Sequence, residues 1–126
     1  MPLRDDLRRI EHMLIVAEEI LEFTEGKTYQ DLLADRGLQY ICIHCIELLG
    51  EAANSISQKL RAKYHDIPWR PITAMRNRLI HGYLDIELTF IWSTVNDDVP
   101  ALIPKLRELL AEEQGDISGT TSTGSN

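Results

Sequence analysis

The first 24 residues carry apolar side chains at alternating intervals of four and three positions. This stripe consists of Leu3, Leu7, Ile10, Leu14, Ala17 and Leu21. Such spacing is typical of a helix that packs along another helix. A second stripe on the same segment consists of Met13, Val16, Ile20 and Phe23. Two apolar faces predict a first helix with more than one neighbour, as in a bundle or at a subunit interface.

A longer apolar face predicts a central helix that runs from about Leu38 to Lys63. Gly50, Ala52 and Ala53 lie near the middle of this segment, where small side chains allow another backbone to approach closely. The alternative for Gly50 is a tolerated helix glycine that costs about 1 kcal/mol. The apolar face consists of Ile41, Cys45, Leu48, Leu49, Ala52, Ile56 and Leu60.

Two prolines, Pro68 and Pro71, bracket a loop after the central helix. Pro71 can begin the next helix, because the first helical turn does not need the N–H that proline lacks. We predict a third helix from about Pro71 to His81, with Gly82 as its C-terminal cap. His81 then lies in the last turn of this helix.

Prolines also interrupt the last apolar stripe, which ends at Leu110. Asp85 resembles an N-cap for this segment. Pro100 and Pro104 must kink or split it, and the acidic pair at 97–98 favours a fresh helix start near that point. We therefore predict either two helices or one bent helix.

The helical periodicity and the lack of strand alternation predict an all-α fold, an antiparallel bundle of four to five helices. A chain of 126 residues has room for one domain, which we place at residues 1–114. Gly, Ser and Thr dominate residues 115–126, which we predict to be a disordered tail. The N-terminus lacks the apolar core of a secretory signal, and no apolar run approaches the roughly 20 residues of a membrane helix. We expect a cytoplasmic protein without membrane association.

The net charge of −7 argues against a protein that coats nucleic acid by bulk attraction. The charge is unevenly distributed, because residues 59–78 hold one anion, Asp66, and a local charge of +5. A basic segment in an acidic chain suits a site for a polyanion, and the alternative is a solvated helix end and loop. The six cations of this segment are Lys59, Arg61, Lys63, Arg70, Arg76 and Arg78.

The two cysteines, Cys42 and Cys45, are three positions apart in the central helix. This spacing argues against a disulfide framework. With His44 they raise the alternative of a metal-binding bundle, but a closed zinc site needs four ligands and no second Cys/His pair with suitable spacing follows. We interpret both cysteines as buried or half-buried helix residues, and we expect no metal.

Residues 76–83 read Arg-Asn-Arg-Leu-Ile-His-Gly-Tyr and point most clearly to chemistry. On a helix Asn77 and His81 share a face, while Arg76 is rotated by about 100° and still reaches the same cleft. The C-terminal end of a helix favours the protonated form of His81. This set suits metal-free RNA cleavage, in which the ribose 2′-OH attacks the adjacent phosphate. That reaction needs a proton acceptor, a cation and an orienting donor.

One histidine and one arginine supply half of what that reaction normally uses. Two copies that meet about a two-fold axis would combine two sets of Arg76, Asn77 and His81 in one cleft. The alternative is that the motif has no catalytic role. His81 would then be a capping or surface residue, the arginines would be solvated, and the Tyr83 ring would pack with its hydroxyl in solvent. Arg78 faces away from Arg76 and is at most a phosphate contact.

Taken with Pro68-Trp69, the stretch from Ile46 to Ala53 and the segment from Trp92 to Leu106, the motif resembles the HepT branch of the HEPN ribonuclease toxins. The resemblance covers most of the chain. It implies an all-helical homodimer that cuts RNA without a metal or another cofactor. The catalytic residues that it implies are Arg76, Asn77 and His81.

The same resemblance implies a type VII-like toxin–antitoxin pair. The toxin is encoded beside a small nucleotidyltransferase antitoxin of the MntA type, which uses ATP and attaches AMP to the tyrosine that matches Tyr83. Our hypothesis is therefore a metal-independent endoribonuclease toxin that Tyr83 modification silences. Arg78 and Arg70 are its expected contacts with RNA phosphates. The alternative is a non-catalytic helical module that partners a nucleotidyltransferase and uses the motif as a docking surface.

Overall fold

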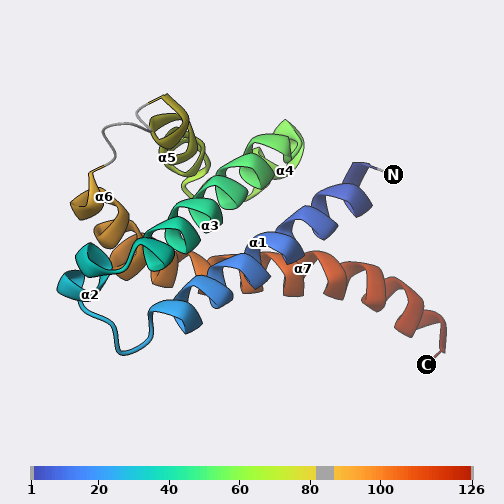
Figure 1. Ribbon diagram of the computed structural model, residues 1–126. Helices are drawn as coiled ribbons and strands as arrows, with labels where there is room; N and C mark the ends of the chain where they lie inside the picture. The colour runs from blue at the N-terminus through green and yellow to red at the C-terminus, as the bar shows by residue number, and fades with distance from the viewer. Residues whose placement is uncertain (1, 82–86, 126) are drawn as a thin grey trace.

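The computed structural model describes residues 2–81 and 87–125, with the backbone alone for residues 2, 80, 81 and 116–125. Every element in these ranges is helical, which confirms the predicted all-α bundle (Figure 1). The elements are α1 (Pro2–Thr24), α2 (Tyr29–Ala34), α3 (Arg36–Ser55), α4 (Gln58–Lys63), α5 (Trp69–His81), α6 (Leu88–Ser93), the π-helical turn η2 (Thr94–Asp98) and α7 (Val99–Ser125).

The core lies where α1 packs against both α3 and α7. Ile10, Met13 and Ile20 of α1 are fully buried there, together with Ile46 of α3 and Leu106 of α7. The two apolar stripes of α1 therefore have two neighbours, as the pattern predicts. On its other side α3 packs against α5, so α3 lies between α1 and the helix that holds the motif (Figure 1).

The prediction of one continuous helix from Leu38 to Lys63 is wrong, because α3 ends at Ser55 and α4 begins at Gln58. The break is stabilised by Asp6 of α1, which is only 3% exposed. Its carboxylate accepts from the backbone N–H of Ser57 at 3.0 Å and from the Ser57 hydroxyl at 2.5 Å. The Ser57 hydroxyl oxygen in turn accepts from the N–H of Leu60 at 3.3 Å and caps α4.

The last apolar segment is one helical run that widens into η2 just before Pro100. The N–H of Val99 donates to the carbonyl of Thr94, five residues back, as in a π-helix. Since Pro100 has no N–H and its ring crowds the preceding turn, the wider turn accommodates it at the start of α7. Of the two predicted alternatives, two helices or one bent helix, the structure has the continuous one: residues 97–98 lie within η2, and α7 follows directly from Val99. Asp85, the predicted N-cap, lies outside the described residues.

Helix α5 begins at Trp69, two residues before the predicted start at Pro71, and its backbone is helical to His81 as predicted. Gly82, the predicted cap, lies outside the described residues. The backbone of α7 is helical as far as Ser125, and its last turns extend away from the other helices (Figure 1). The division into a domain at 1–114 and a disordered tail at 115–126 stays a prediction. Within the described ranges, no helix is both long enough and apolar enough to cross a bilayer.

Candidate functional site

Gly50 lets α5 approach α3 closely at the position of Arg76. A Cβ atom added at Gly50 would overlap the Cβ of Arg76, and would lie 3.1 Å from its Cγ and 3.2 Å from the carbonyl oxygen of Ile72. These neighbours are backbone or backbone-anchored atoms, so a larger residue could enter only if a helix moved. The close-approach interpretation of Gly50 is therefore confirmed over that of a merely tolerated glycine.

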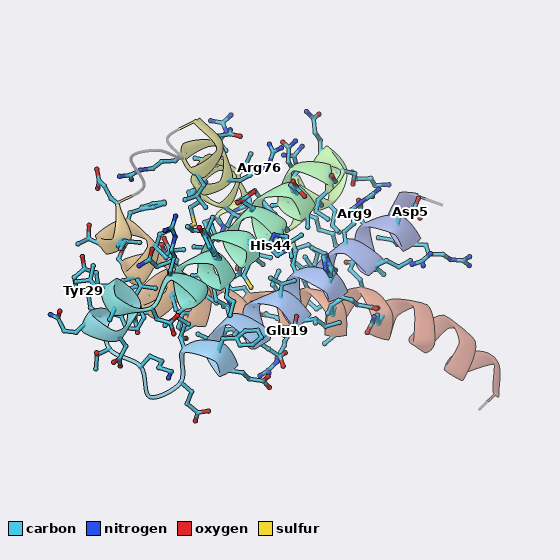
Figure 2. All side chains as sticks on the ribbon, viewed as in Figure 1. Asp5, Arg9, Glu19, Tyr29, His44 and Arg76 are labelled. Atoms are coloured by element: carbon cyan, nitrogen blue, oxygen red, sulfur yellow. The ribbon has the colours of Figure 1, made fainter. Side chains whose placement is uncertain are left out.

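The Arg76 side chain lies beside this contact (Figure 2), and its own contacts are long. Its Nη1 donates to Oδ1 of Asn77 at 3.4 Å, while its Nε lies 4.0 Å from Oε1 of Glu51, beyond hydrogen-bond distance. That Nε is buried and has no hydrogen-bond partner among the described residues. An arginine side chain that is 28% exposed and whose guanidinium makes only long contacts with the described residues is suited to bind an anion, above all a phosphate.

One face of α5 points to solvent. Arg70 and Asn77 lie on this face two turns apart, with Ala74 between them, and all three are exposed. His81 is the last residue of α5, one turn beyond Asn77. The His81 side chain and the whole of Tyr83 lie outside the described residues. The structure thus brings Arg76 and Asn77 together, and the roles of His81 and Tyr83 stay predictions.

Arg78 is directed to another part of the molecule. Its Nη2 lies 3.1 Å from Oε2 of Glu87, and its Cζ lies 4.0 Å from the centre of the Phe90 ring. This ion pair and cation–π contact tie α5 to the start of α6. Neither partner can be predicted from the sequence, because nothing in the spacing shows that residues nine and twelve positions apart meet across a helix junction.

In the folded protein, carboxylates from other parts of the chain offset part of the positive charge of residues 59–78. Lys63 makes an ion pair with Glu113 of α7, Arg78 makes one with Glu87 just before α6, and Arg76 lies near Glu51. Among the residues described, no ion pair is seen for Arg70 in the exposed first turn of α5. Arg70 is therefore better placed than Arg78 to meet an external phosphate.

A buried polar cluster fixes the entry to α5. Lys63 and Tyr64 both donate to Oε2 of Glu113 on α7 at 2.6 Å, and the indole N–H of Trp69 donates to the Tyr64 carbonyl at 3.0 Å. Burial raises the pKa of Glu113, but the hydrogen bonds from Lys63 and Tyr64 outweigh it and leave this pKa below its ordinary value. Burial, together with the bond to Glu113, raises the pKa of Tyr64. This cluster holds α4, α7 and the first turn of α5 together.

The cysteines behave as the sequence analysis predicts. Cys42 and Cys45 are buried and free, and burial raises the pKa of Cys42 to about 11. His44 lies between them in the sequence but is exposed on the outer face of α3, so the three side chains do not converge (Figure 2). Over the described part of the chain, no three His, Cys, Asp or Glu side chains gather as metal ligands. The geometry gives no support to the metal-binding alternative.

Comparison with known proteins adds a family to this geometry. A family model described as "Ribonuclease HepT-like" matches residues 13–109, a range that contains Gly50 and all of α5. "Probable ribonuclease HepT" of Thermococcus cleftensis is 34% identical over 79% of this chain and 91% of its own length. "Putative RNase TTE0752" of Caldanaerobacter subterraneus subsp. tengcongensis is 30% identical over 83% of this chain and 94% of its own. No solved structure matches the chain.

Proposed function

This chain belongs to the HepT-like ribonuclease family, and from that premise we propose that it is a metal-independent endoribonuclease whose site is built on α5. The observation that carries the proposal is the state of Arg76. Its guanidinium contacts Asn77, has a buried Nε without a hydrogen-bond partner among the described residues, and lies within the range that the family model matches. The ribonuclease-family resemblance stated from the sequence is confirmed, while the catalytic assignment remains our proposal.

In the proposed reaction the ribose 2′-OH attacks the adjacent phosphorus, a P–O bond forms, and the bond to the 5′ oxygen of the next nucleotide breaks. His81 exchanges protons with the 2′-OH and the leaving oxygen. Arg76 neutralises the charge that develops on the phosphorane oxygens, and Asn77 orients them by hydrogen bonding. The products are a 2′,3′-cyclic phosphate and a 5′-hydroxyl. Arg70 would hold a neighbouring phosphate, and Arg78 would do so only after leaving Glu87.

We further propose that two copies form the complete site. Helix α5 packs mainly against α3, and its face with Arg70, Ala74 and Asn77 is exposed in one copy. If these faces meet about a two-fold axis, the cleft receives Arg76, Asn77 and His81 from each copy. Each histidine would then carry out one of the two proton transfers. The dimer would thus supply the second histidine and the second arginine that a single chain lacks.

Control of this activity is also part of the proposal. In a toxin–antitoxin pair of the cytoplasm, an ATP-using nucleotidyltransferase of the MntA type would attach AMP to Tyr83, two residues beyond the end of α5. The added phosphodiester charge and bulk would repel RNA at the mouth of the cleft. The chain itself would need no cofactor.

The test is cleavage of total RNA by the purified, unmodified protein in EDTA, beside His81→Ala and the matched control His12→Ala. His12 is an exposed histidine of α1, outside the proposed site. The proposal expects discrete fragments with 2′,3′-cyclic phosphate ends from the parent and from His12→Ala, and none from His81→Ala. Light scattering should give the same dimer mass for all three proteins.

Retained cleavage by His81→Ala would overturn the catalytic role of that residue. If the parent does not cut RNA although mass spectrometry finds Tyr83 unmodified, the endoribonuclease proposal fails. Co-purification of such an inactive protein with a nucleotidyltransferase would favour the non-catalytic binding module instead.

A further inference from the structure

A surface groove begins beside the candidate site and runs along α3 towards its N-terminal end. Its walls come from α2 and α3 on one side and from α5 and α6 on the other. Most of its polar lining lies on a single face of α3, at intervals of three or four residues. The residues that matter here are Arg36, Tyr40, His44, Glu47, Leu79 and Leu88.

Tyr40 is the most exposed large apolar side chain among the described residues, at 58% of its surface. Its hydroxyl accepts a hydrogen bond from Nε of Arg36 at 2.9 Å, and the Arg36 Cζ lies 5.7 Å from the centre of the ring. This double contact fixes the orientation of the ring while leaving it open to solvent. An ordered, exposed aromatic ring beside a guanidinium is the arrangement on which proteins stack unpaired bases.

The groove lies close enough to the candidate site for one RNA strand to reach both. Leu79, which lines it, lies three residues after Arg76 on α5, and α5 ends at His81 two residues later. On α3, Tyr40 precedes Gly50 by ten residues, or about 15 Å of helix. Since Gly50 contacts Arg76, a single strand with one phosphate at Arg76 would reach Tyr40 within a few nucleotides.

We propose that this groove binds an unpaired base of the RNA strand next to the cleaved phosphodiester. The base stacks on Tyr40, and the backbone passes Arg36 and His44, which contact its phosphates. The carboxylate of Glu47 repels phosphate and therefore faces the base edge, from whose N–H groups it can accept hydrogen bonds. The inference rests on the proposed function and adds the form of its substrate, a single strand rather than a duplex.

The lining favours RNA over a second copy of the chain. Protein interfaces are depleted of charged residues at their centres, whereas this groove brings Arg36, Glu47 and His44 together. Aromatic rings interleaved with basic groups are typical of single-strand binding. A protein occupant is therefore treated as an outcome of the test.

The test measures the binding of a fluorescein-labelled, fully 2′-O-methylated oligoribonucleotide, which has no free 2′-OH and cannot be cut. Fluorescence anisotropy compares the parent with Tyr40→Ala, Tyr40→Phe and the control Tyr29→Phe, a half-buried tyrosine of α2 outside this groove. Loss of one stacked base should weaken binding by Tyr40→Ala about tenfold. Tyr40→Phe keeps the ring and should stay within about twofold of the parent, as should Tyr29→Phe. A duplex of the same sequence should bind the parent and Tyr40→Ala equally.

Two results would overturn the inference. The first is equal binding of the single strand by Tyr40→Ala and the parent. The second is loss of the dimer in Tyr40→Ala by light scattering, which would make the groove an interface between copies. Failure of the proposed function would give a different result from failure of this inference. The parent would not cleave ordinary RNA, while the oligonucleotide would still bind in a Tyr40-dependent way.

Discussion

The protein holds two kinds of polar cluster, and their contacts differ sharply. At the α1–α4–α7 end, the carboxylates of Asp6 and Glu113 are almost fully buried, and each accepts two hydrogen bonds of 2.5–3.0 Å. On α5, the contacts of Arg76 within the described part of the chain are one bond of 3.4 Å to Asn77 and a carboxylate, Glu51, at 4.0 Å. The first cluster satisfies its charges within the fold, and the second leaves donors for something outside it. Short, complete pairing indicates a structural role, and long, incomplete pairing beside an open face indicates a binding role.

The largest expected effect comes from removing the loosely held cation. Arg76→Ala should lower the rate of RNA cleavage by about a hundredfold or more, because the charge that stabilises the transition state is lost. The free energy of unfolding should change by less than about 1 kcal/mol, since the partners of Arg76 are weak. Urea denaturation measures stability, and a gel assay measures cleavage.

Arg9→Ala is the matched control for this substitution. Arg9 is also a partly exposed arginine near a carboxylate, with its Nη1 3.9 Å from Oδ1 of Asp6. It lies on α1, so its removal should leave cleavage unchanged. Equal loss of activity in both variants would contradict the contrast between the clusters.

Next in size is the loss of a complete cluster. Asp6→Ala leaves the N–H and hydroxyl of Ser57 without their acceptor and should cost about 3 kcal/mol of unfolding free energy. Glu51→Ala removes a carboxylate that is 55% exposed and 4.0 Å from its partner, so its cost should stay below about 0.5 kcal/mol. Urea denaturation of both variants is the measurement. A smaller loss for Asp6→Ala than for Glu51→Ala would reverse the assignment of roles.

A methyl group at the contact between α3 and α5 tests how closely the site depends on that packing. Gly50→Ala forces a Cβ against the Cβ of Arg76, and should cost about 1–2 kcal/mol although alanine is the better helix former. Gly115→Ala is the control, because a Cβ there meets nothing within 4 Å and should be neutral or stabilising. Thermal unfolding distinguishes the two. A neutral Gly50→Ala would show that the two helices adjust freely.

The smallest effect concerns pH. The pKa of Glu113 lies below its ordinary value of 4.5 in the folded protein, so its ionised form contributes stability above pH 4.5. That contribution disappears as the pH falls below 4.5 and through the folded-state pKa. Glu113→Gln should be about 1 kcal/mol less stable than the parent at pH 7, and the difference should shrink in acid. A difference that is constant down to pH 3 would contradict this account.

Much of the fold follows from the periodicity of the apolar residues. The two stripes of α1, the helix that carries the motif and an irregularity of the helix near Pro100 are all readable from local spacing. The break between α3 and α4 is not, because the carboxylate that stabilises it comes from Asp6, 51 residues earlier. The π turn likewise depends on where α6 and α7 pack, which the position of Pro100 alone does not determine.

For the candidate site, the sequence predicts which residues take part better than it predicts which residues they contact. Arg76 and Asn77 were identified from the motif, and the small side chain of Gly50 from its place in α3. The contacts of Arg78 with Glu87 and Phe90 were missed, because ion-pair partners are chosen by the packing of helices. The position of Glu51 next to Gly50 in the sequence is the signal for its place near Arg76. The roles of His81 and Tyr83 stay predictions.

The packing of α5 mainly against α3 has a consequence for the concentration dependence of the enzyme. A helix with one main packing neighbour opens at a lower free-energy cost than the core helices around it. In the proposed dimer a second copy covers its outer face, so association and the ordering of the catalytic helix are thermodynamically linked. Dilution would then remove activity by two routes at once, since separated copies lose half of the cleft and loosen the half that they keep.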